Sequence, residues 1–346
     1  MSARRVLVTG ASGFIGRALV PLLRLQGVPV SAQYRTPSLA PADPHDVIAD
    51  LGDLAGLNDG AGVADPDRHN DPTGTGTLAW RRALDSVDAV IHLAGIAHRD
   101  ASVPDQHFER INHQASAALA TLAQAAGVQR FILISSINAM GTATANRSRT
   151  ADLALPDCYR PDTPETPCDA YGASKLAAEQ ALRQICARGA MQWTVVRPPL
   201  VYGRGAKGNL ARLMRWVQAG YPVPVARPPN RRSMIGLPNL TSLIAASLSH
   251  DTFAQRIVLP SDICWSTRDL IAAIAAAMHR PARFMHLPGP AVERLGRLFG
   301  RERSVRPITA SLVIADPWLT EWSDSWPDHD PAAIVAAMVD EFGRHP

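Results

Sequence analysis

The sequence predicts an α/β protein in which helices cover both faces of a parallel β-sheet. Two observations support this prediction: short apolar strands alternate with helical segments through the first half of the chain, and a glycine-rich turn directly follows the first strand. A helix between two strands carries the chain back across the sheet, so consecutive strands run parallel. The length of 346 residues favours two domains or one large one.

The strands are predicted from apolar runs that are too short for helices and are bounded by turn residues or helical segments. The first run, VLVT, spans residues 6–9. The other runs lie at 29–34, 46–50, 89–94, 131–136, 193–197 and 256–259.

The helices are predicted where apolar residues recur with a period near 3.6. Gly27 and Gly127 end the first two, and Ser266 with Asp269 has the spacing of a capping box. The predicted helices span 14–25, 108–126, 171–188, 209–218, 267–279 and 331–342. Segments 55–78 and 142–167 show no apolar period and are predicted to be irregular, the first as a surface insertion.

The turn after the first strand, GASGFIG, has glycines at positions 10, 13 and 16 and leads into a helix. These glycines permit a tight turn and a close approach of the backbone to a ligand. The helix N-terminus adds free N–H groups and the positive end of a dipole. The turn therefore predicts a pyrophosphate site in a Rossmann-type dinucleotide-binding fold.

The two expected domains follow from this fold. Residues 1–198 and 233–260 are assigned to the dinucleotide-binding domain, with the second segment returning to the sheet. Residues 199–232 and 261–346 are assigned to a smaller α+β domain that binds the substrate. The strand and helix rhythm loosens after Pro198, which is why the boundary is set there.

The composition argues against several classes of function. The net charge of +4 is mild and lacks the dense basic stripe of a nucleic-acid-binding module. No window is apolar enough for a membrane span, and the N-terminus does not resemble a signal peptide. The four cysteines show no zinc spacing and indicate reduced thiols, so we expect a cytoplasmic protein with no metal.

The segment YGASK places Tyr171 four residues before Lys175, so both lie on one face of the predicted helix. Of the 35 basic residues only two are lysines, and Lys207 is the other. A free tyrosine has a pKa near 10, but a neighbouring ammonium favours the phenolate. This pair is therefore suited to take a proton from a hydroxyl group.

The glycine turn, HLAG at 92–95 and YGASK at 171–175 together resemble the extended short-chain dehydrogenase/reductase superfamily, and more narrowly its NAD-dependent nucleotide-sugar epimerase/dehydratase family. The segments RPPLVYG at 197–203, GAKGN at 205–209 and NRRSMIGL at 230–237 also have counterparts in this family. The closing segment at 316–326 matches more loosely. The resemblance thus extends over nearly the whole chain.

The resemblance implies a bound NAD or NADP and a set of residues that contact it. They are Gly10, Ser12, Gly13, Phe14, Ile15, Gly16, Arg35, Asp50, Leu51, Leu93, Ala94, Gly95, Tyr171, Lys175 and Pro198.

The choice between the two cofactors depends on the end of the second strand, where an acidic residue binds the ribose of NAD. Tyr34 and Arg35 stand there instead. Arg35 or Arg17 is suited to pair with the 2′-phosphate of NADP, although Arg35 is equally explained as a surface arginine. We lean towards NADP(H) on this ground.

The resemblance also implies that Ser136 hydrogen-bonds the reacting sugar oxygen and completes a catalytic set with Tyr171 and Lys175; Ser135 is the less favoured neighbour. Family members that eliminate water carry an acidic pair directly after this residue. Ile137 and Asn138 occupy these positions, so dehydration has no evident acid and base.

For the substrate, Arg232 matches a family arginine that clamps the nucleotide diphosphate, and Asn209 matches a phosphate or sugar contact. Arg231 is a second candidate for the clamp. Lys207 either contacts a phosphate or is a solvated loop residue.

The favoured function is a 4-epimerase that acts by hydride transfer at C4 of a nucleotide-linked hexose, with UDP as the favoured nucleotide. The alternative is a 4-keto nucleotide-sugar reductase, which uses the same residues. A non-catalytic dinucleotide-binding regulator is less favoured because the catalytic set is complete. The resemblance further implies a homodimer and a role in making cell-surface polysaccharides.

Overall fold

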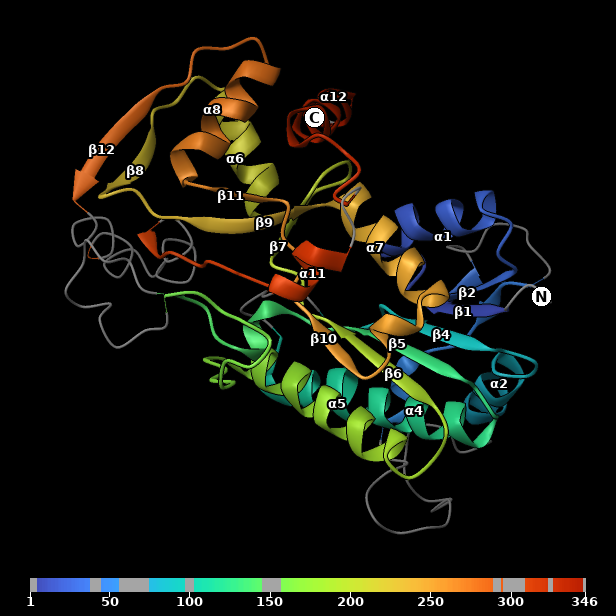
Figure 1. Cartoon of the computed structure of the whole chain (residues 1–346). Coiled ribbons are helices and arrows are strands. Elements are labelled where there is room, and N and C mark those ends of the chain that lie inside the picture. Colours follow the sequence, from blue (N-terminus) through green and yellow to red (C-terminus); the bar gives the residue numbers. More distant parts are fainter. Residues whose placement is uncertain are drawn as a thin grey trace. The chain divides into compact units, whose positions relative to one another are not determined.

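The computed structural model of the chain describes residues 5–37, 45–55, 75–96, 103–144, 157–288, 294, 309–322 and 326–344 (Figure 1). The chain divides into two units. The first comprises Met1–Gly141, Pro164–Arg197 and Thr241–Val258, and the second comprises Thr142–Thr163, Pro198–Leu240 and Leu259–Pro346.

The first unit is built on a seven-stranded sheet in which every neighbouring pair is parallel. Its spatial order is β10-β6-β5-β4-β1-β2-β3, so the strand order reverses between β1 and β4. The predicted parallel sheet is thereby confirmed. The strands are β1 (Val6–Thr9), β2 (Val30–Tyr34), β3 (Val47–Ile48), β4 (Ala89–His92), β5 (Arg130–Ile134), β6 (Gln192–Val196) and β10 (Arg256–Val258).

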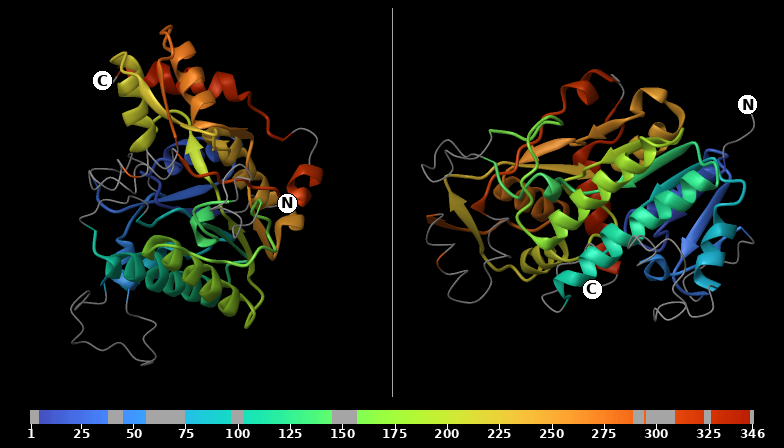
Figure 2. Two further views of the ribbon diagram at one scale, coloured as in Figure 1. Left: turned by 90° about the vertical axis from the view of Figure 1, so that its left-hand side faces the viewer. Right: turned by 90° about the horizontal axis from the view of Figure 1, so that it is seen from below.

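Helices cover both faces of this sheet, as predicted (Figure 1). On one face α2 (Thr75–Ala83), α4 (Ala115–Ala125) and α5 (Ala170–Cys186) share an apolar core with the strands. Figure 2 shows α4 and α5 side by side along this face. On the other face lie α1 (Gly16–Leu25) and the part of α7 (Leu237–Ser249) that belongs to this unit.

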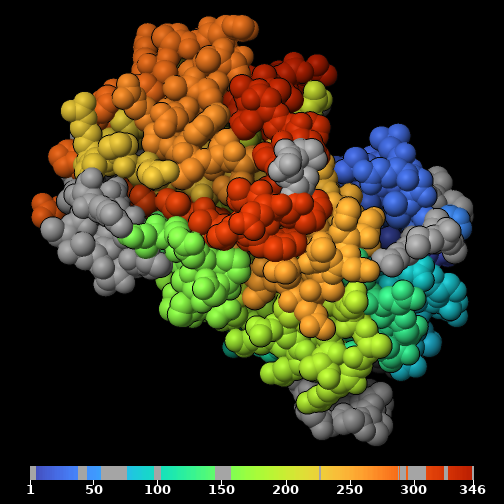
Figure 3. All heavy atoms as spheres, viewed as in Figure 1, coloured from blue at the N-terminus to red at the C-terminus, as the bar shows by residue number. Residues whose placement is uncertain are grey.

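Arg130 at the start of β5 binds the C-terminal end of α7 through hydrogen bonds. It is 2% exposed, and its guanidinium donates to the carbonyl oxygens of Ser247 and Leu248, both at 2.9 Å, and to Asp251 at 2.5 Å. A cation at a helix C-terminus satisfies carbonyl groups that have no partner within the helix. The following segment reaches β10, which pairs with β6, and its atoms (orange) lie against the end of α5 and β6 (yellow-green) in Figure 3.

The second unit contains two small sheets. β11 (Ile263–Trp265), β9 (Arg232–Gly236) and β7 (Leu200–Tyr202) form one, and β12 (Phe284–Pro288) and β8 (Val223–Arg227) form the other. The helices α6 (Asn209–Gln218), α8 (Thr267–Ala277) and α12 (Pro331–Arg344) share an apolar core with these strands. A short helix, α11 (Pro317–Trp322), also belongs to the described part of this unit. The predicted capping box of Ser266 and Asp269 is present at the start of α8.

Two expected boundaries differ from this division. Of the segment 233–260, only β10 rejoins the large sheet, because β9 pairs with β7 and β11. Segment 142–163 belongs to the second unit, where Thr144 and Tyr159 form bridges with Ser311 and Ile314.

Two predicted elements also need correction. The irregular segment 55–78 ends inside α2, whose Trp80 is fully buried and donates through Nε1 to the carbonyl oxygen of Asp50 at 3.0 Å; residues 56–74 lie outside the described part. The helix predicted at 108–126 is interrupted. A short α3 (Asp105–Phe108) and a π-helical turn, Glu109–Gln114, precede α4.

Candidate active site

The turn between β1 and α1 is packed too tightly for side chains at Gly10 and Gly16. A Cβ atom on Gly16 would lie 2.4 Å from the carbonyl oxygen of Gly10. Gly10 has a φ of 70°, and a Cβ there would lie 2.8 Å from the backbone nitrogen of Ala94. The turn after β1 therefore lies directly against the loop after β4, at the point where the strand order reverses.

This turn fits the pyrophosphate of a dinucleotide. The N–H groups of residues 17–19 donate to the carbonyl oxygens of Gly13 and Ile15, so the N–H groups left free for an anion are those at residues 14–16. No side chain caps this helix N-terminus among the described residues. Exposed N–H groups at a helix N-terminus are a general anion site. Arg17 adds positive charge nearby, since its Nε donates to the carbonyl oxygen of Ser12 at 2.8 Å.

A chain of hydrogen bonds holds the loop after β4. The backbone N–H of Ala94 donates to Thr9 Oγ1 at 3.2 Å, Thr9 Oγ1 lies 2.7 Å from His92 Nδ1, and His92 Nε2 lies 2.8 Å from Ser116 Oγ. Burial, with a smaller contribution from the Lys175 charge, lowers the pKa of His92 to about 3. His92 is therefore neutral and has a structural role.

The ends of β2 and β3 also meet the turn. Gln33 accepts from the N–H of Gly10 at 2.9 Å and donates to the carbonyl oxygen of Ala49 at 2.5 Å. After β3, Asp50 accepts from the N–H of Gly52 at 2.8 Å, and the Leu51 side chain is buried in the core. Arg35 is exposed at the end of β2.

Tyr171 and Lys175 lie one turn apart near the N-terminus of α5, as predicted. Asp169 caps this helix by accepting from the N–H of Gly172 at 2.7 Å. The Tyr171 ring is half-buried and contacts the Phe108 ring edge-on, with 6.0 Å between their centroids. The half-buried position leaves part of the ring accessible to a ligand.

Lys175 is 6% exposed, and its Nζ donates to the carbonyl oxygen of Ile134, the last residue of β5, at 3.1 Å. A Cβ atom on Gly95 would lie 3.3 Å from the same Nζ. The lysine thus reaches the loop after β4 that also contacts the phosphate turn. Burial lowers its pKa to about 8, and the negative charge of Glu179 opposes this effect.

The two serines at the end of β5 have different partners. Ser136 is half-buried and caps a short 3₁₀ turn, Ile137–Ala139, by accepting from the N–H of Asn138 at 3.2 Å. Ser135 is buried and donates its hydroxyl hydrogen to the Glu179 carboxylate. Ser135 is therefore engaged within the protein, and the role of Ser136 stays a prediction.

A buried ionic network lies behind these residues, and the sequence interpretation did not include it. Glu179 pairs with Arg197, whose Nε and Nη2 lie 3.0 Å and 2.5 Å from one carboxylate oxygen. Arg197 also donates to Glu165 at 2.9 Å. The spacing of Tyr171, Lys175 and Glu179 at every fourth residue was the available signal, because it places three ionisable groups on one helix face.

Asn112 is a second residue that the sequence interpretation missed. It is 1% exposed in the π-helical turn and exchanges hydrogen bonds with the backbone of Ile96, at 2.8 Å and 3.1 Å. Its amide also donates to Ser174 at 3.1 Å, which joins α5 to the loop after β4. Its place in a π-helical turn had no sequence signal.

The second unit contains Pro198 and the candidate substrate residues Lys207, Asn209, Arg231 and Arg232, whereas the first contains Ser136 and the other expected cofactor residues. Pro198 is buried after β6, and Asn209 is exposed as the first residue of α6. Arg232 begins β9 and donates to the carbonyl oxygen of Ala310 at 3.2 Å. Arg231 is exposed.

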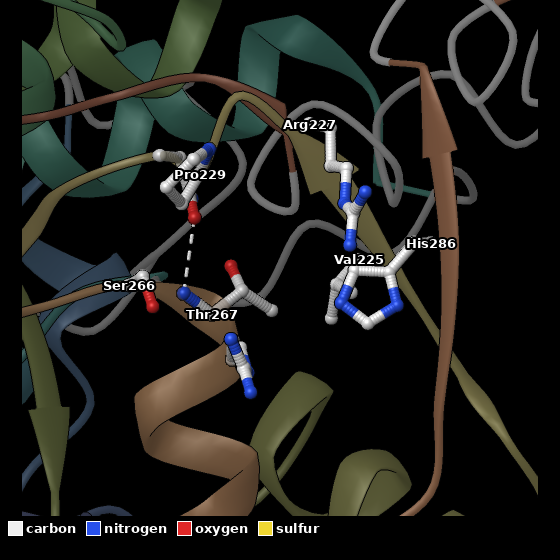
Figure 4. A pocket seen from close by; sticks show the side chains of 8 residues that line it. Val225, Arg227, Pro229, Ser266, Thr267 and His286 are labelled. Carbon is white, nitrogen blue, oxygen red and sulfur yellow. Dashed lines mark hydrogen bonds between the residues drawn. The ribbon is translucent and has the colours of Figure 1, made fainter.

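A small cavity of about 90 Å³ in the second unit lies between β8, β12 and the start of α8. Figure 4 shows the side chains of Arg227 and His286 next to each other on its wall. Arg268 also lines it, while Asn209 and Arg232 do not. The cavity is therefore basic but does not contain the expected substrate residues.

The described ranges contain no helix long and apolar enough to cross a membrane. Within the same ranges, no group of three or more His, Cys, Asp and Glu side chains is arranged to hold a metal ion. The four cysteines are all free.

The fold and the phosphate turn define a dinucleotide-binding α/β protein, and sequence comparison identifies its family. Residues 6–228 match the NAD dependent epimerase/dehydratase family. The chain is 30% identical over 318 residues to a UDP-glucose 4-epimerase of Vibrio cholerae, covering 90% of this chain and 87% of that protein. The chain therefore belongs to this enzyme family.

Two further relatives illustrate the range of the family. A 2'-dehydrokanamycin reductase of Streptomyces kanamyceticus is 28% identical over 299 residues, which is 82% of this chain and 69% of the reductase. The crystal structure of a UDP-glucuronic acid 4-epimerase from Bacillus cereus in complex with NAD superposes with a TM-score of 0.71 at 17% identity, covering 98% of this chain and 99% of the epimerase. This superposition supports the Rossmann-type fold.

Proposed function

We propose that the protein is an NAD(P)-dependent 4-epimerase of a nucleotide-linked hexose, with UDP as the favoured nucleotide. The observation that carries the proposal is the placement of Tyr171 and Lys175 one turn apart on α5, with the Lys175 ammonium buried beside the loop that contacts the phosphate turn. The similarity of 90% of the chain to a UDP-glucose 4-epimerase supports this reaction.

In this proposal the residues after β1, β2, β3 and β4 hold the cofactor. The N–H groups at residues 14–16 bind the pyrophosphate, and the absence of side chains at Gly10 and Gly16 allows the close backbone packing that shapes this turn. Asp50 and the backbone of Leu51 contact the adenine, since the Leu51 side chain is buried. Residues 93–95 and Pro198 contact the remaining part of the cofactor.

The chemistry requires Tyr171 to act as the base. Tyr171 takes the proton of the C4 hydroxyl, Ser136 hydrogen-bonds the same oxygen, and the Lys175 ammonium favours the phenolate. The cofactor held by these residues would supply, when bound, the acceptor and donor of the C4 hydride. Asn209 and Arg232 bind the nucleotide diphosphate, so that the sugar is able to turn over while the nucleotide remains bound.

A 4-keto reductase is the second candidate, and Arg35 favours it. The end of β2 offers an exposed arginine and no carboxylate at residues 34 and 35, which suits the 2′-phosphate of NADP. A reductase draws on free reduced cofactor, and one relative is a reductase. Water elimination has no support, because the buried Ile137 and Asn138 offer no carboxyl group.

Assays of the purified protein separate these candidates. Interconversion of UDP-hexose C4 epimers without added cofactor supports the epimerase, and NADPH consumption with a 4-keto nucleotide sugar supports the reductase. Failure of both reactions, with the measured function unchanged in a Tyr171→Phe variant, would favour a non-catalytic regulator. The homodimer and the cytoplasmic location stay predictions, the first of which sedimentation velocity would test.

A further inference from the structure

Glu179 is a buried carboxylate on the same face of α5 as the two proposed catalytic residues. It follows Lys175 by four residues and Tyr171 by eight, and it is 1% exposed. Burying a charge is unfavourable unless the charge is paired and hydrogen-bonded. The partners of Glu179 therefore indicate what this carboxylate does.

Those partners come from the segments that carry the rest of the site. Ser135 and Ser136 end β5, and Ser135 donates to Glu179. Arg197 directly follows β6 and is fully buried, with three contacts to the Glu179 carboxylate between 2.5 Å and 3.1 Å. Its other bond reaches Glu165, in the segment that leads into α5.

We propose that Glu179 is a positioning residue that fixes α5 against the ends of β5 and β6 and provides the negative charge beside the Lys175 ammonium. This inference rests on the proposed catalytic roles of Ser136, Tyr171 and Lys175. It assigns to Glu179 an action through those residues, without contact with the substrate.

The positioning follows from the direction of neighbouring side chains. Ser136 has extended backbone angles, with φ −156° and ψ 150°. Successive side chains of an extended chain point to opposite sides. Glu179 holds the Ser135 hydroxyl on the α5 side and thereby turns Ser136 away from that network, where the Ser136 hydroxyl accepts from the N–H of Asn138.

The charge balance around Lys175 involves groups from three elements. On α5 these are Tyr171 and Glu179, and from β4 His92 faces the lysine but is neutral, because burial lowers its pKa to about 3. Arg197, after β6, faces Glu179; burial lowers its pKa, but bonding to Glu179 and Glu165 outweighs this and raises it. Among these groups, Glu179 supplies the charge that keeps the buried ammonium protonated against the effect of burial.

The chain contains only two lysines, which makes a direct test practical. Full-length protein labelled with ¹³C-lysine gives two ε-carbon signals by NMR, and the Lys207→Arg variant assigns them. The Lys175 signal should titrate near pH 8 in the wild type. In Glu179→Gln, which keeps the side-chain shape, the titration midpoint should fall by about one pH unit.

Two further variants separate charge from structure. Ser135→Ala removes one hydrogen bond and keeps the Glu179 charge, so the midpoint of Lys175 should stay at the wild-type value. If Glu179→Gln alone does not fold, the double variant Glu179→Gln/Arg197→Met removes both buried charges, and the midpoint should still fall. An unchanged Lys175 midpoint in the folded variant that lacks the carboxylate would overturn the inference.

This measurement requires no turnover, so it is independent of the proposed reaction. Full activity of a Tyr171→Phe variant would overturn the proposed function. The effect of Glu179→Gln on the Lys175 titration would still decide the inference about Glu179. For an active enzyme, the alkaline decline of kcat should move to lower pH in Glu179→Gln, because Lys175 then loses its proton earlier. A uniform loss of activity at every pH would contradict the charge role.

Discussion

Two regions at the carboxyl ends of the strands in the seven-stranded sheet are held by different interactions. The turn after β1 consists of backbone, and an added Cβ at Gly16 would lie 2.4 Å from a carbonyl oxygen. The region around α5 consists of buried charges, since Lys175, Glu179 and Arg197 are at most 6% exposed. Steric space therefore limits which residues the first region tolerates, whereas the balance of buried charges limits which residues the second tolerates.

This difference predicts two kinds of response to mutation. Adding atoms to the turn should impair cofactor binding and stability at every pH, because a steric clash with the backbone does not depend on protonation. Changing a charge near α5 should alter the rate and its pH dependence while the shape persists. The predictions below test this contrast.

Tyr171→Phe is expected to have the largest effect. Removing the hydroxyl removes the proposed base, so kcat/KM should fall by about 10²- to 10⁴-fold. The ring should keep its contact with Phe108, so the free energy of unfolding should change by less than about 1 kcal/mol. Steady-state kinetics and thermal unfolding measure both quantities, and a rate within a few-fold of wild type would contradict the assignment.

Gly16→Ala should mainly lower stability and cofactor affinity, in contrast to Tyr171→Phe, which should mainly lower the rate. The added methyl group meets the backbone of Gly10 and Ala11, at 2.4 Å and 2.7 Å, so unfolding should become easier by about 1–3 kcal/mol. Dinucleotide affinity, measured by calorimetry, should fall while the pH profile of any remaining activity stays unchanged. Gly343→Ala in α12 is the control, because nothing lies within 4 Å of its added Cβ. Equal behaviour of the two variants would contradict the steric account.

Lys175→Arg tests whether charge alone is sufficient. The variant keeps a positive charge, but the larger planar guanidinium must fit where Gly95 lies close to the Lys175 ammonium. We expect the protein to remain folded and kcat to fall by about 10- to 100-fold. Near-normal turnover would show that this position requires only a cation.

The smallest effect concerns His92 and acid stability. The pKa of His92 is about 3 in the folded protein and near 6.5 when unfolded, so the unfolded chain binds more protons between these values. Its contribution to stability is therefore complete above pH 6.5 and is lost as the pH falls, by up to about 1.4 kcal/mol per pH unit. Urea unfolding at pH 7 and pH 5 should show a smaller difference in His92→Asn than in wild type. Equal pH dependence would contradict this account.

Local patterns predicted much of the first unit. The bounds of β1 match the apolar run VLVT, and α1 ends at Leu25, where its apolar period was predicted to end. In the second unit, short half-buried strands such as β7 and β11 have little local pattern and depend on their partner β9 for definition. The return of 233–260 to the sheet was wrong for β9 for this reason.

The candidate site divides in a similar way. Tyr171, Lys175 and the three glycines were predicted because their roles depend on spacing within one segment. Asn112 was missed because its role depends on Ile96 and Ser174, which lie 16 and 62 residues away along the chain. Which of the two serines faces the network with Glu179 was likewise a tertiary question.

The sequence alone determined the phosphate turn and the helix that bears Tyr171 and Lys175, because short-range sterics and helical periodicity specify both. It also determined the family, through the match of its motifs to those of related proteins. The tertiary structure decided the surroundings of these groups. Burial of Lys175 against β5, and of Glu179 between Ser135 and Arg197, brings together segments that are distant in the chain. Burial sets the strength of a charge interaction, so the pKa of Lys175 is determined by the tertiary structure and not by the local sequence.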